Sequence, residues 1–174
     1  MSMQVNESTL QVDAGAKYLT FELDSGVYGI PILNVREIIA MQPVTPLPRM
    51  PHAIQGVINL RGKIIPVLDL RKSLSLHAAD HDRSTCIVVL DVESGDQNQV
   101  NIGCVVDAVH EVSNVKDESV QDPPSIGNRL DSDYILGLAK MPGTDHVVTL
   151  LNMRIVLAEF MADSAGFDSM GMDL

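Results

Sequence analysis

GVINLRGKIIPVLDLR, residues 56–71, decides the fold class because it holds two apolar runs on either side of a polar pair, Arg61 and Gly62. Both runs are rich in Val, Ile and Leu, and such residues favour pleated strands. Gly62 is free to adopt the positive φ that a tight turn between two strands needs. The stretch therefore predicts a hairpin with strands over 54–60 and 63–68, followed by a helical turn over 70–73.

Similar strand signals continue on both sides of this hairpin, with turn residues such as Asp24, Ser25 and Gly26 between them. Pro31 can begin a helical turn over 32–34, and the spacing of apolar residues predicts a last helix from Asn152 to about Met161. The fold class is therefore all-β with minor helix. The other strands are expected over 18–23, 27–30, 37–41, 84–92, 100–106, 109–115, 134–138 and 146–151.

The connections divide the chain into an expected ordered domain and two tails. Residues 74–83 are polar and form the clearest internal boundary, so the strand-rich halves on either side suggest paired small barrels. Residues 1–16 and 161–174 lack periodicity and are expected to be flexible tails, which leaves 17–160 as the domain. Three further connections are expected: an extended one from Pro43 to Pro51, which contains four prolines, a turn at 94–96 and a loop over 116–128.

The charge balance disfavours several classes of partner. There are 12 Lys and Arg against 23 Asp and Glu, which gives a formal net charge of −11. Nucleic-acid binding depends largely on basic residues, and so does attraction to anionic membranes, so neither partner is expected. The chain contains no run of 18 apolar residues and no basic, then apolar, leader, so we expect neither membrane insertion nor secretion, and a cytoplasmic location.

The sequence contains no recognisable catalytic apparatus. Cys86 and Cys104 each lie in an apolar run and are interpreted as buried thiols, because reactive cysteines need electropositive surroundings. His77 and His81 have the spacing of zinc ligands on a helix, but they lie in the polar segment without a third His or Cys nearby. The glycines form no phosphate-binding motif. We therefore expect no enzyme activity, no metal and no cofactor, and a small metal-dependent hydrolase remains a distant alternative.

Five motifs occur in an order that resembles the CheW family of chemotaxis coupling proteins. The most specific is 56–71, quoted above. The others are GIPILNVREI at 29–38, IGCVVDAV at 102–109, YILG at 134–137 and LLN at 150–152. The resemblance covers roughly residues 17–160. It implies two small five-stranded β-barrel subdomains that share a hydrophobic core, followed by a C-terminal helix.

The resemblance also implies a function. Proteins of this family couple chemoreceptors, through the cytoplasmic receptor tip, to the regulatory domain of the CheA histidine kinase, and they help to assemble signalling arrays. Two alternatives remain open. One is the coupling module of another chemosensory pathway, such as a twitching-type one. The other is the coupling module of a CheV-like protein without its receiver domain, because a receiver needs roughly 120 residues and only 14 follow Phe160 here.

Site residues follow from the same resemblance, position by position. Two sets are implied, one for receptor binding and one for kinase binding or packing in the second barrel. The family fold also brings the runs that contain Glu37 and Arg61 side by side and so implies a salt bridge between these two residues, with isolated exposed charges as the alternative. The receptor-binding candidates are Val35, Glu37, Gly56, Asn59, Leu60 and Arg61, and the second set is Gly103, Val105, Val109 and Gly137.

Overall fold

A computed structural model describes residues 16–77, 79–93, 99–124, 133–141 and 145–163. Its helical elements are η1 (Ile32–Asn34), α2 (Leu70–Ser73), η2 (Asp117–Ser119) and α4 (Met153–Asp163). The strands are β1 (Ala16–Leu23), β2 (Gly26–Pro31), β3 (Val35–Ala40), β4 (Ile54–Leu60), β5 (Lys63–Asp69), β6 (Cys86–Glu93), β7 (Gln99–Val106), β8 (Ala108–Val115), β9 (Val120–Gln121), β10 (Ile135–Lys140) and β11 (Val147–Leu151).

The prediction of a mostly β chain with a C-terminal helix is confirmed, although some boundaries differ. The strand expected at 37 begins at Val35, and the expected loop over 116–128 contains η2 and the short β9. β1 begins at Ala16 and α4 continues to Asp163, each slightly beyond the predicted domain. The rest of both predicted tails and the turn at 94–96 lie outside the described residues.

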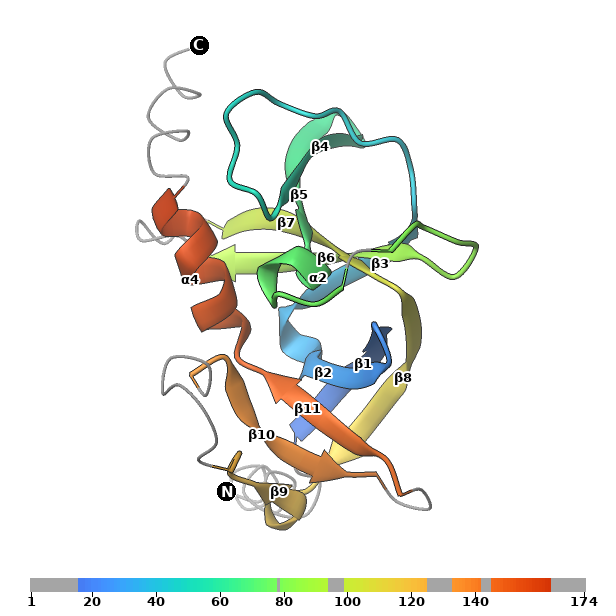
Figure 1. The fold of residues 1–174 in the computed structure, drawn as a ribbon, viewed down its shortest axis with the longest axis vertical. Helices are drawn as coiled ribbons and strands as arrows, with labels where there is room; N and C mark the ends of the chain where they lie inside the picture. The colour runs from blue at the N-terminus through green and yellow to red at the C-terminus, as the bar shows by residue number, and fades with distance from the viewer. Residues whose placement is uncertain (1–15, 78, 94–98, 125–132, 142–144, 164–174) are drawn as a thin grey trace, which may run out of the picture.

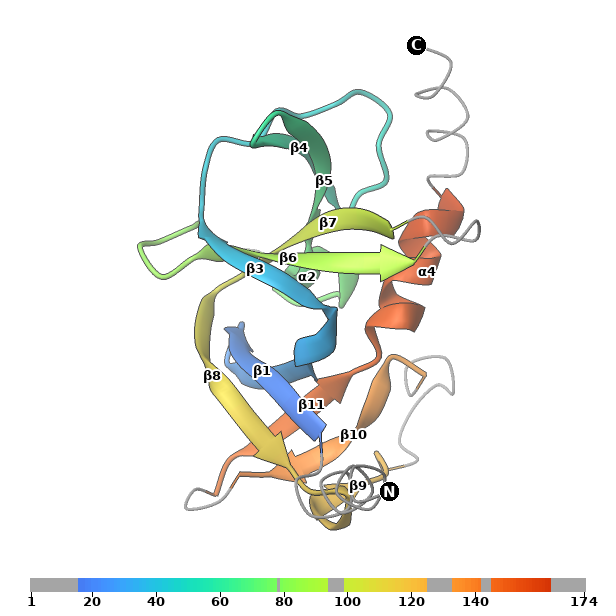
Figure 2. The ribbon, with the colours of Figure 1, turned by 180° about the vertical axis from the view of Figure 1, so that it is seen from behind.

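The strands form two sheets, and the six-stranded sheet takes its strands from two separate parts of the chain. The six-stranded sheet has the order β8-β1-β2-β11-β10-β9, and the five-stranded sheet has the order β3-β6-β7-β5-β4. Figures 1 and 2 show the five-stranded sheet above the six-stranded one, with α4 beside their junction. The expectation of five strands in each subdomain is therefore wrong for the first sheet, where β9 adds a sixth strand.

Residues 74–83 do not separate the two sheets, so the interpretation of strand-rich halves is wrong. β5 and β6 flank this segment, yet both belong to the five-stranded sheet. The chain changes sheet elsewhere, through η1 between β2 and β3, and at Asp107 between β7 and β8. A polar segment marks exposed backbone, which here is a connection within one sheet.

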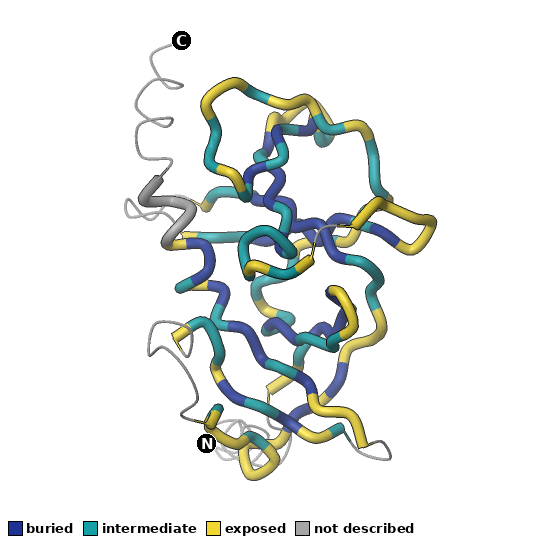
Figure 3. The backbone as a smooth tube through the Cα atoms, viewed as in Figure 1, coloured by how far each residue is buried: buried dark blue, intermediate teal, exposed yellow. Residues whose placement is uncertain are grey.

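The central strands are buried on both faces because successive side chains point into two different cores (Figure 3). In β6, Val88 and Leu90 contribute to a large core shared with β1 and α4, while Ile87 and Val89 point into a core enclosed by the five-stranded sheet. This double burial explains why β6 is a continuous apolar run rather than an alternating one. A third core, around Leu150, belongs to the six-stranded sheet.

The two edges of the five-stranded sheet approach each other. β3 and β4 are its edge strands and do not pair with each other directly. However, Thr45, in the connection after β3, forms an isolated bridge with Val57 of β4, with N to O distances of 2.9 Å in both directions. The sheet is therefore strongly curled around its core. Complete barrel closure stays a prediction.

The buried thiol of Cys104 leads to a testable prediction. Burial raises its pKa from 9.0 to about 12, and burial also raises the pKa of the half-buried Cys86. Three pKa units lower the reactive thiolate fraction at pH 8 about a thousandfold. We expect iodoacetamide to label Cys104 at pH 8 only after unfolding in urea, as read by peptide mass spectrometry. Labelling of Cys104 at equal rates in native and urea-unfolded protein would contradict this.

Candidate partner-binding surface

The turn between β4 and β5 presents Arg61 at its tip. Leu60 pairs with Lys63, so the turn contains only Arg61 and Gly62. Both have positive φ, 52° and 83°, as in the type I′ turns that match the twist of two antiparallel strands. The side-chain oxygen of Asn59 accepts a hydrogen bond from the Gly62 N–H at 2.8 Å. Asn59 therefore supports the turn that positions Arg61.

Arg61 reaches across to Glu37 on β3, at the opposite edge of the sheet. Its two terminal nitrogens donate hydrogen bonds to the two carboxylate oxygens of Glu37, at 2.8 and 2.6 Å. The Arg61 side chain is 71% exposed and that of Glu37 is 22% exposed. The structure thus pairs the two residues, but β3 and β4 are not neighbouring strands as the sequence interpretation assumed. The ion pair spans the same gap that the Thr45–Val57 bridge spans.

The six receptor-binding candidates all belong to the five-stranded sheet or its β4–β5 turn, but they differ in exposure. Gly56 is buried, and Val35 and Leu60 pack partly against the cores. Glu37, Asn59 and Arg61 offer polar groups at the surface. The first three residues therefore shape the sheet, and the last three are the accessible part of the candidate surface.

Exposed apolar side chains adjoin these residues in the chain, and sequence reasoning missed them. Leu33 of η1 is 92% exposed, Ile64 of β5 is 63% exposed and Ile38 of β3 is 45% exposed. Ile38 neighbours Glu37 on an edge strand, where alternation places every second residue outward. This alternation could have predicted from the sequence that Ile38 is exposed. Large apolar side chains at the surface are common in partner-binding sites when they are grouped.

The second set of candidates does not lie together in one subdomain. Gly103 and Val105 are in β7 of the five-stranded sheet, whereas Val109 and Gly137 are in β8 and β10 of the six-stranded sheet. The expectation that all four belong to the second barrel is therefore wrong. Gly103, Val105 and Gly137 are buried, and a Cβ on Gly137 would lie 2.4 Å from Val120 Cγ1. Their burial favours packing over direct contact with a partner.

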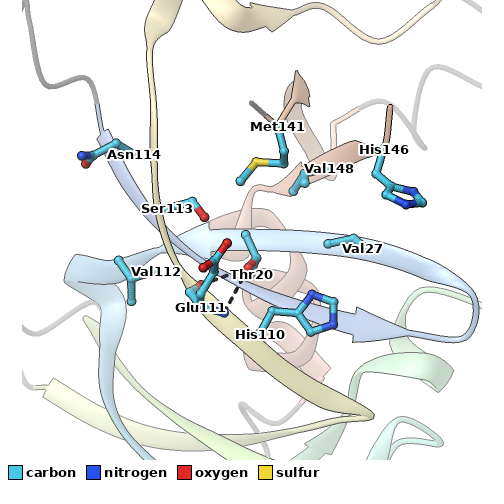
Figure 4. A pocket seen from close by; sticks show the side chains of 10 residues that line it. All are labelled: Thr20, Val27, His110, Glu111, Val112, Ser113, Asn114, Met141, His146 and Val148. Carbon is cyan, nitrogen blue, oxygen red and sulfur yellow. Dashed lines mark hydrogen bonds between the residues drawn. The ribbon is translucent and has the colours of Figure 1, made fainter. Parts of the chain in front are cut away.

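A groove of about 500 Å³ lies on the six-stranded sheet. Figure 4 shows its lining side chains, which come from β1, β2, β8 and the region of β11. The Thr20 hydroxyl donates a hydrogen bond to the backbone oxygen of Glu111 at 2.9 Å, and His110 lies 3.0 Å from a carboxylate oxygen of Glu22.

His77, one of the two histidines considered as zinc ligands, lies outside this groove, with its Nδ1 atom 3.2 Å from a carboxylate oxygen of Asp24.

Neither a metal centre nor a membrane-spanning helix is found in the described part of the chain. No group of three or more His, Cys, Asp or Glu side chains there is arranged to hold a metal ion. Among the same residues, no helix is both long and apolar enough to cross a membrane.

The comparisons with known proteins identify the family. The family model of the CheW-like domain matches residues 17–160. The chain belongs to the CheW-like family. The chemotaxis protein CheW of Treponema pallidum is 32% identical over 152 residues, covering 85% of this chain and 82% of the relative. That of Klebsiella aerogenes is 35% identical over 127 residues, covering 73% and 74%.

Two further relatives extend the family assignment. FrzA of Myxococcus xanthus is 30% identical over 141 residues, covering 81% of this chain and 84% of FrzA. Among solved structures, the scaffolding protein TtCheW of Thermoanaerobacter tengcongensis matches with a TM-score of 0.70 and 30% identity, covering 81% of this chain and 86% of that chain. The two-sheet β fold described above is thus the fold of a CheW scaffold.

The Glu37–Arg61 pair predicts a pH dependence. The hydrogen bonds from Arg61 hold the pKa of Glu37 below its ordinary value of 4.5. A lowered pKa in the folded state adds stability that is fully present above pH 4.5 and is lost as the pH falls through the folded-state pKa. We expect Glu37→Gln to reduce the free energy of unfolding at pH 7, and the difference from the parent to shrink below pH 4.5.

Urea denaturation at pH 7, 4.5 and 3 measures this difference. Glu118→Gln, at an exposed carboxylate of η2, is the matched control for removing a negative charge from this acidic chain. A Glu37→Gln difference that does not change with pH, or that follows the Glu118→Gln difference, would contradict the expectation.

Proposed function

We propose that this CheW-like protein couples chemoreceptors to a CheA-type histidine kinase in the cytoplasm and helps to assemble their signalling arrays. The observation that carries the proposal is the CheW-like match over 17–160, which takes in nearly all of the described chain. An activity based on binding is consistent with relatives named as chemotaxis and scaffolding proteins. The proposed partners are the cytoplasmic tip of a receptor and the regulatory domain of the kinase.

The proposed receptor-binding surface is centred on Glu37, Asn59 and Arg61. The ion pair and the Asn59-supported turn hold these polar groups in fixed positions, so little side-chain entropy is lost on binding. Ile64 pairs with Asn59 across the hairpin, and Ile38 follows Glu37 on β3; both are exposed and can supply apolar contact area. Exposed apolar residues with polar groups around them correspond to the apolar centre and polar rim of protein interfaces.

We assign kinase binding to the six-stranded sheet. Val109 and Gly137 belong to this sheet, and Leu136, next to Gly137, is 43% exposed. Gly103 and Val105 then support the fold rather than the contact, because both are buried in β7. On this assignment the two partners use different sheets, which a bridging protein requires if both are to bind at once.

Matched substitutions on the two sheets test the assignment. Ile38 and Leu136 are exposed to nearly the same extent, so Ile38→Glu and Leu136→Glu should disturb folding equally little. We expect Ile38→Glu to weaken binding to a receptor-tip fragment at least about tenfold without affecting the kinase, and Leu136→Glu to do the reverse. Isothermal titration with each partner measures both effects. Loss of both partners in either folded variant would contradict the use of separate faces.

A second assignment is coupling in another chemosensory pathway, such as a twitching-type one. Both assignments require the same two-partner chemistry. Recovery of the native receptor and kinase with this protein from its own cells would distinguish them.

A further inference from the structure

Asp107 is the single residue between the last residue of β7 and the first residue of β8, where the chain passes from one sheet to the other. Its backbone N–H donates a hydrogen bond to the backbone oxygen of Glu22 in β1 at 3.0 Å. The yellow ribbon in Figure 1 follows this passage from β7 into β8. Any change in the angle between the sheets must therefore alter the backbone at or near Asp107.

Arg71 holds the Asp107 side chain from the other direction. It lies in α2, which directly follows β5, and Asp69 caps this short helix by accepting a hydrogen bond from the Arg71 N–H at 3.0 Å. The Arg71 Nε donates to one carboxylate oxygen of Asp107 at 2.8 Å, and a terminal nitrogen donates to the other. Arg71 thus joins the five-stranded sheet to the passage between the sheets through two hydrogen bonds.

The same guanidinium also contacts the six-stranded sheet. Its other terminal nitrogen donates to the backbone oxygen of His77 at 2.6 Å and lies 3.8 Å from an oxygen of Asp24, in the β1–β2 turn. Asp107 in turn accepts a hydrogen bond from the Asp24 N–H at 2.8 Å. The Arg71 side chain is only 15% exposed and that of Asp107 26%. We call Arg71, Asp107 and Asp24 the intersheet clamp.

The shared apolar core also holds the sheets together, but it acts differently. Apolar attraction is not directional, and packed layers can slide against one another by small shear motions. Charge-assisted hydrogen bonds from a planar guanidinium require one orientation of both partners. The core therefore favours association of the sheets, whereas the clamp can select a single angle between them.

We propose that the intersheet clamp fixes the relative orientation of the two sheets, and that Arg71 is thereby a positioning residue for coupling. The functional part rests on the proposed function, in which receptor and kinase bind to different sheets. With the clamp intact, the two binding faces keep one relative orientation. Without it, each face still binds its partner, but the two partners are no longer held in the arrangement that lets one control the other.

The direct test measures the distance between the sheets. Nitroxide labels at Ile64→Cys in β5 and Lys140→Cys in β10, in a Cys86→Ala background, report on the two sheets by double electron–electron resonance. We expect Arg71→Lys, which keeps the charge but loses the bidentate geometry, and Asp107→Asn to widen the distance distribution at least about 1.5-fold. Arg36→Lys is the matched control, because Arg36 pairs with Asp91 at 3.5 Å between β3 and β6 of one sheet.

Distributions of Arg71→Lys and Asp107→Asn that superimpose on the parent would overturn the clamp and assign the orientation to the core alone. If neither variant folds, Asp24→Asn replaces them, because it removes only the Asp24 charge that faces Arg71. The distance distribution of this variant must then widen for the proposal to stand. Widened distances with undiminished receptor control of kinase activity would overturn the link to coupling. If the parent itself binds neither a receptor-tip fragment nor the kinase, the proposed function fails, while the distance measurement still decides on the clamp.

Discussion

Gly56→Ala is expected to lower the free energy of unfolding by about 4 kcal/mol, the largest effect anticipated for a methyl group added to any glycine that the structure describes. Gly56 has a φ of 149°, which L side chains rarely adopt, and a Cβ there would lie 2.1 Å from the Thr45 oxygen. Relief of this overlap requires Thr45 to move away, which breaks its two hydrogen bonds with Val57. The bridge between Thr45 and Val57, and with it the curvature of the five-stranded sheet, depends on this close contact between Gly56 and Thr45.

Gly62→Ala is the matched control for this measurement. Gly62 also has a positive φ, 83°, but nothing lies within 4 Å of the position that a Cβ would take, so only the conformational cost of about 1 kcal/mol is expected. Urea denaturation of both variants separates the two contributions. Equal losses of stability would show that the approach to Thr45 is not a tight constraint.

Arg61→Glu is expected to weaken binding to a receptor-tip fragment at least about tenfold while the protein stays folded. The substitution places a carboxylate opposite Glu37 and reverses the charge at the tip of the turn. Because Arg61 is 71% exposed, solvent screens the pair, and its loss should cost little stability. The change in binding should therefore be much larger than the change in folding.

The double variant Glu37→Arg/Arg61→Glu distinguishes two roles of the pair. It restores opposite charges across the sheet edges, so stability should return toward that of the parent. If receptor binding stays weak, Arg61 contacts the receptor itself. If binding returns in full, the pair acts only by holding the two edges together. Receptor affinity unchanged in both the single and the double variant would contradict the proposed receptor surface.

The sequence predicted the strands well because their signals are local. The hairpin around Arg61 and Gly62 was predicted from two apolar runs and one glycine, and the structure contains it with a two-residue turn. The sheet order could not be predicted in the same way. β6 is buried on both faces, so its apolar run does not indicate which strands it pairs with, and the polar segment 74–83 suggested a division that the sheets do not have.

The candidate site was predicted unevenly for a related reason. Glu37 and Arg61 were paired through the resemblance to a family, although the structure brings them together across two sheet edges rather than along adjacent strands. Arg71 and Asp107 lie in two of the motifs used for that resemblance, yet they were not singled out. They are 36 residues apart, and no local pattern connects a helix-turn arginine with an aspartate between two strands.

The most direct test of the coupling function is receptor control of kinase activity as a function of the concentration of this protein. Receptor-tip assemblies and the kinase are held constant, and autophosphorylation is measured while the protein is titrated. A bridge with one site for each partner should raise receptor-dependent control to a maximum near equimolar amounts. Excess protein should then lower it, because each partner becomes saturated separately. Receptor control that is the same with and without the protein would contradict the account.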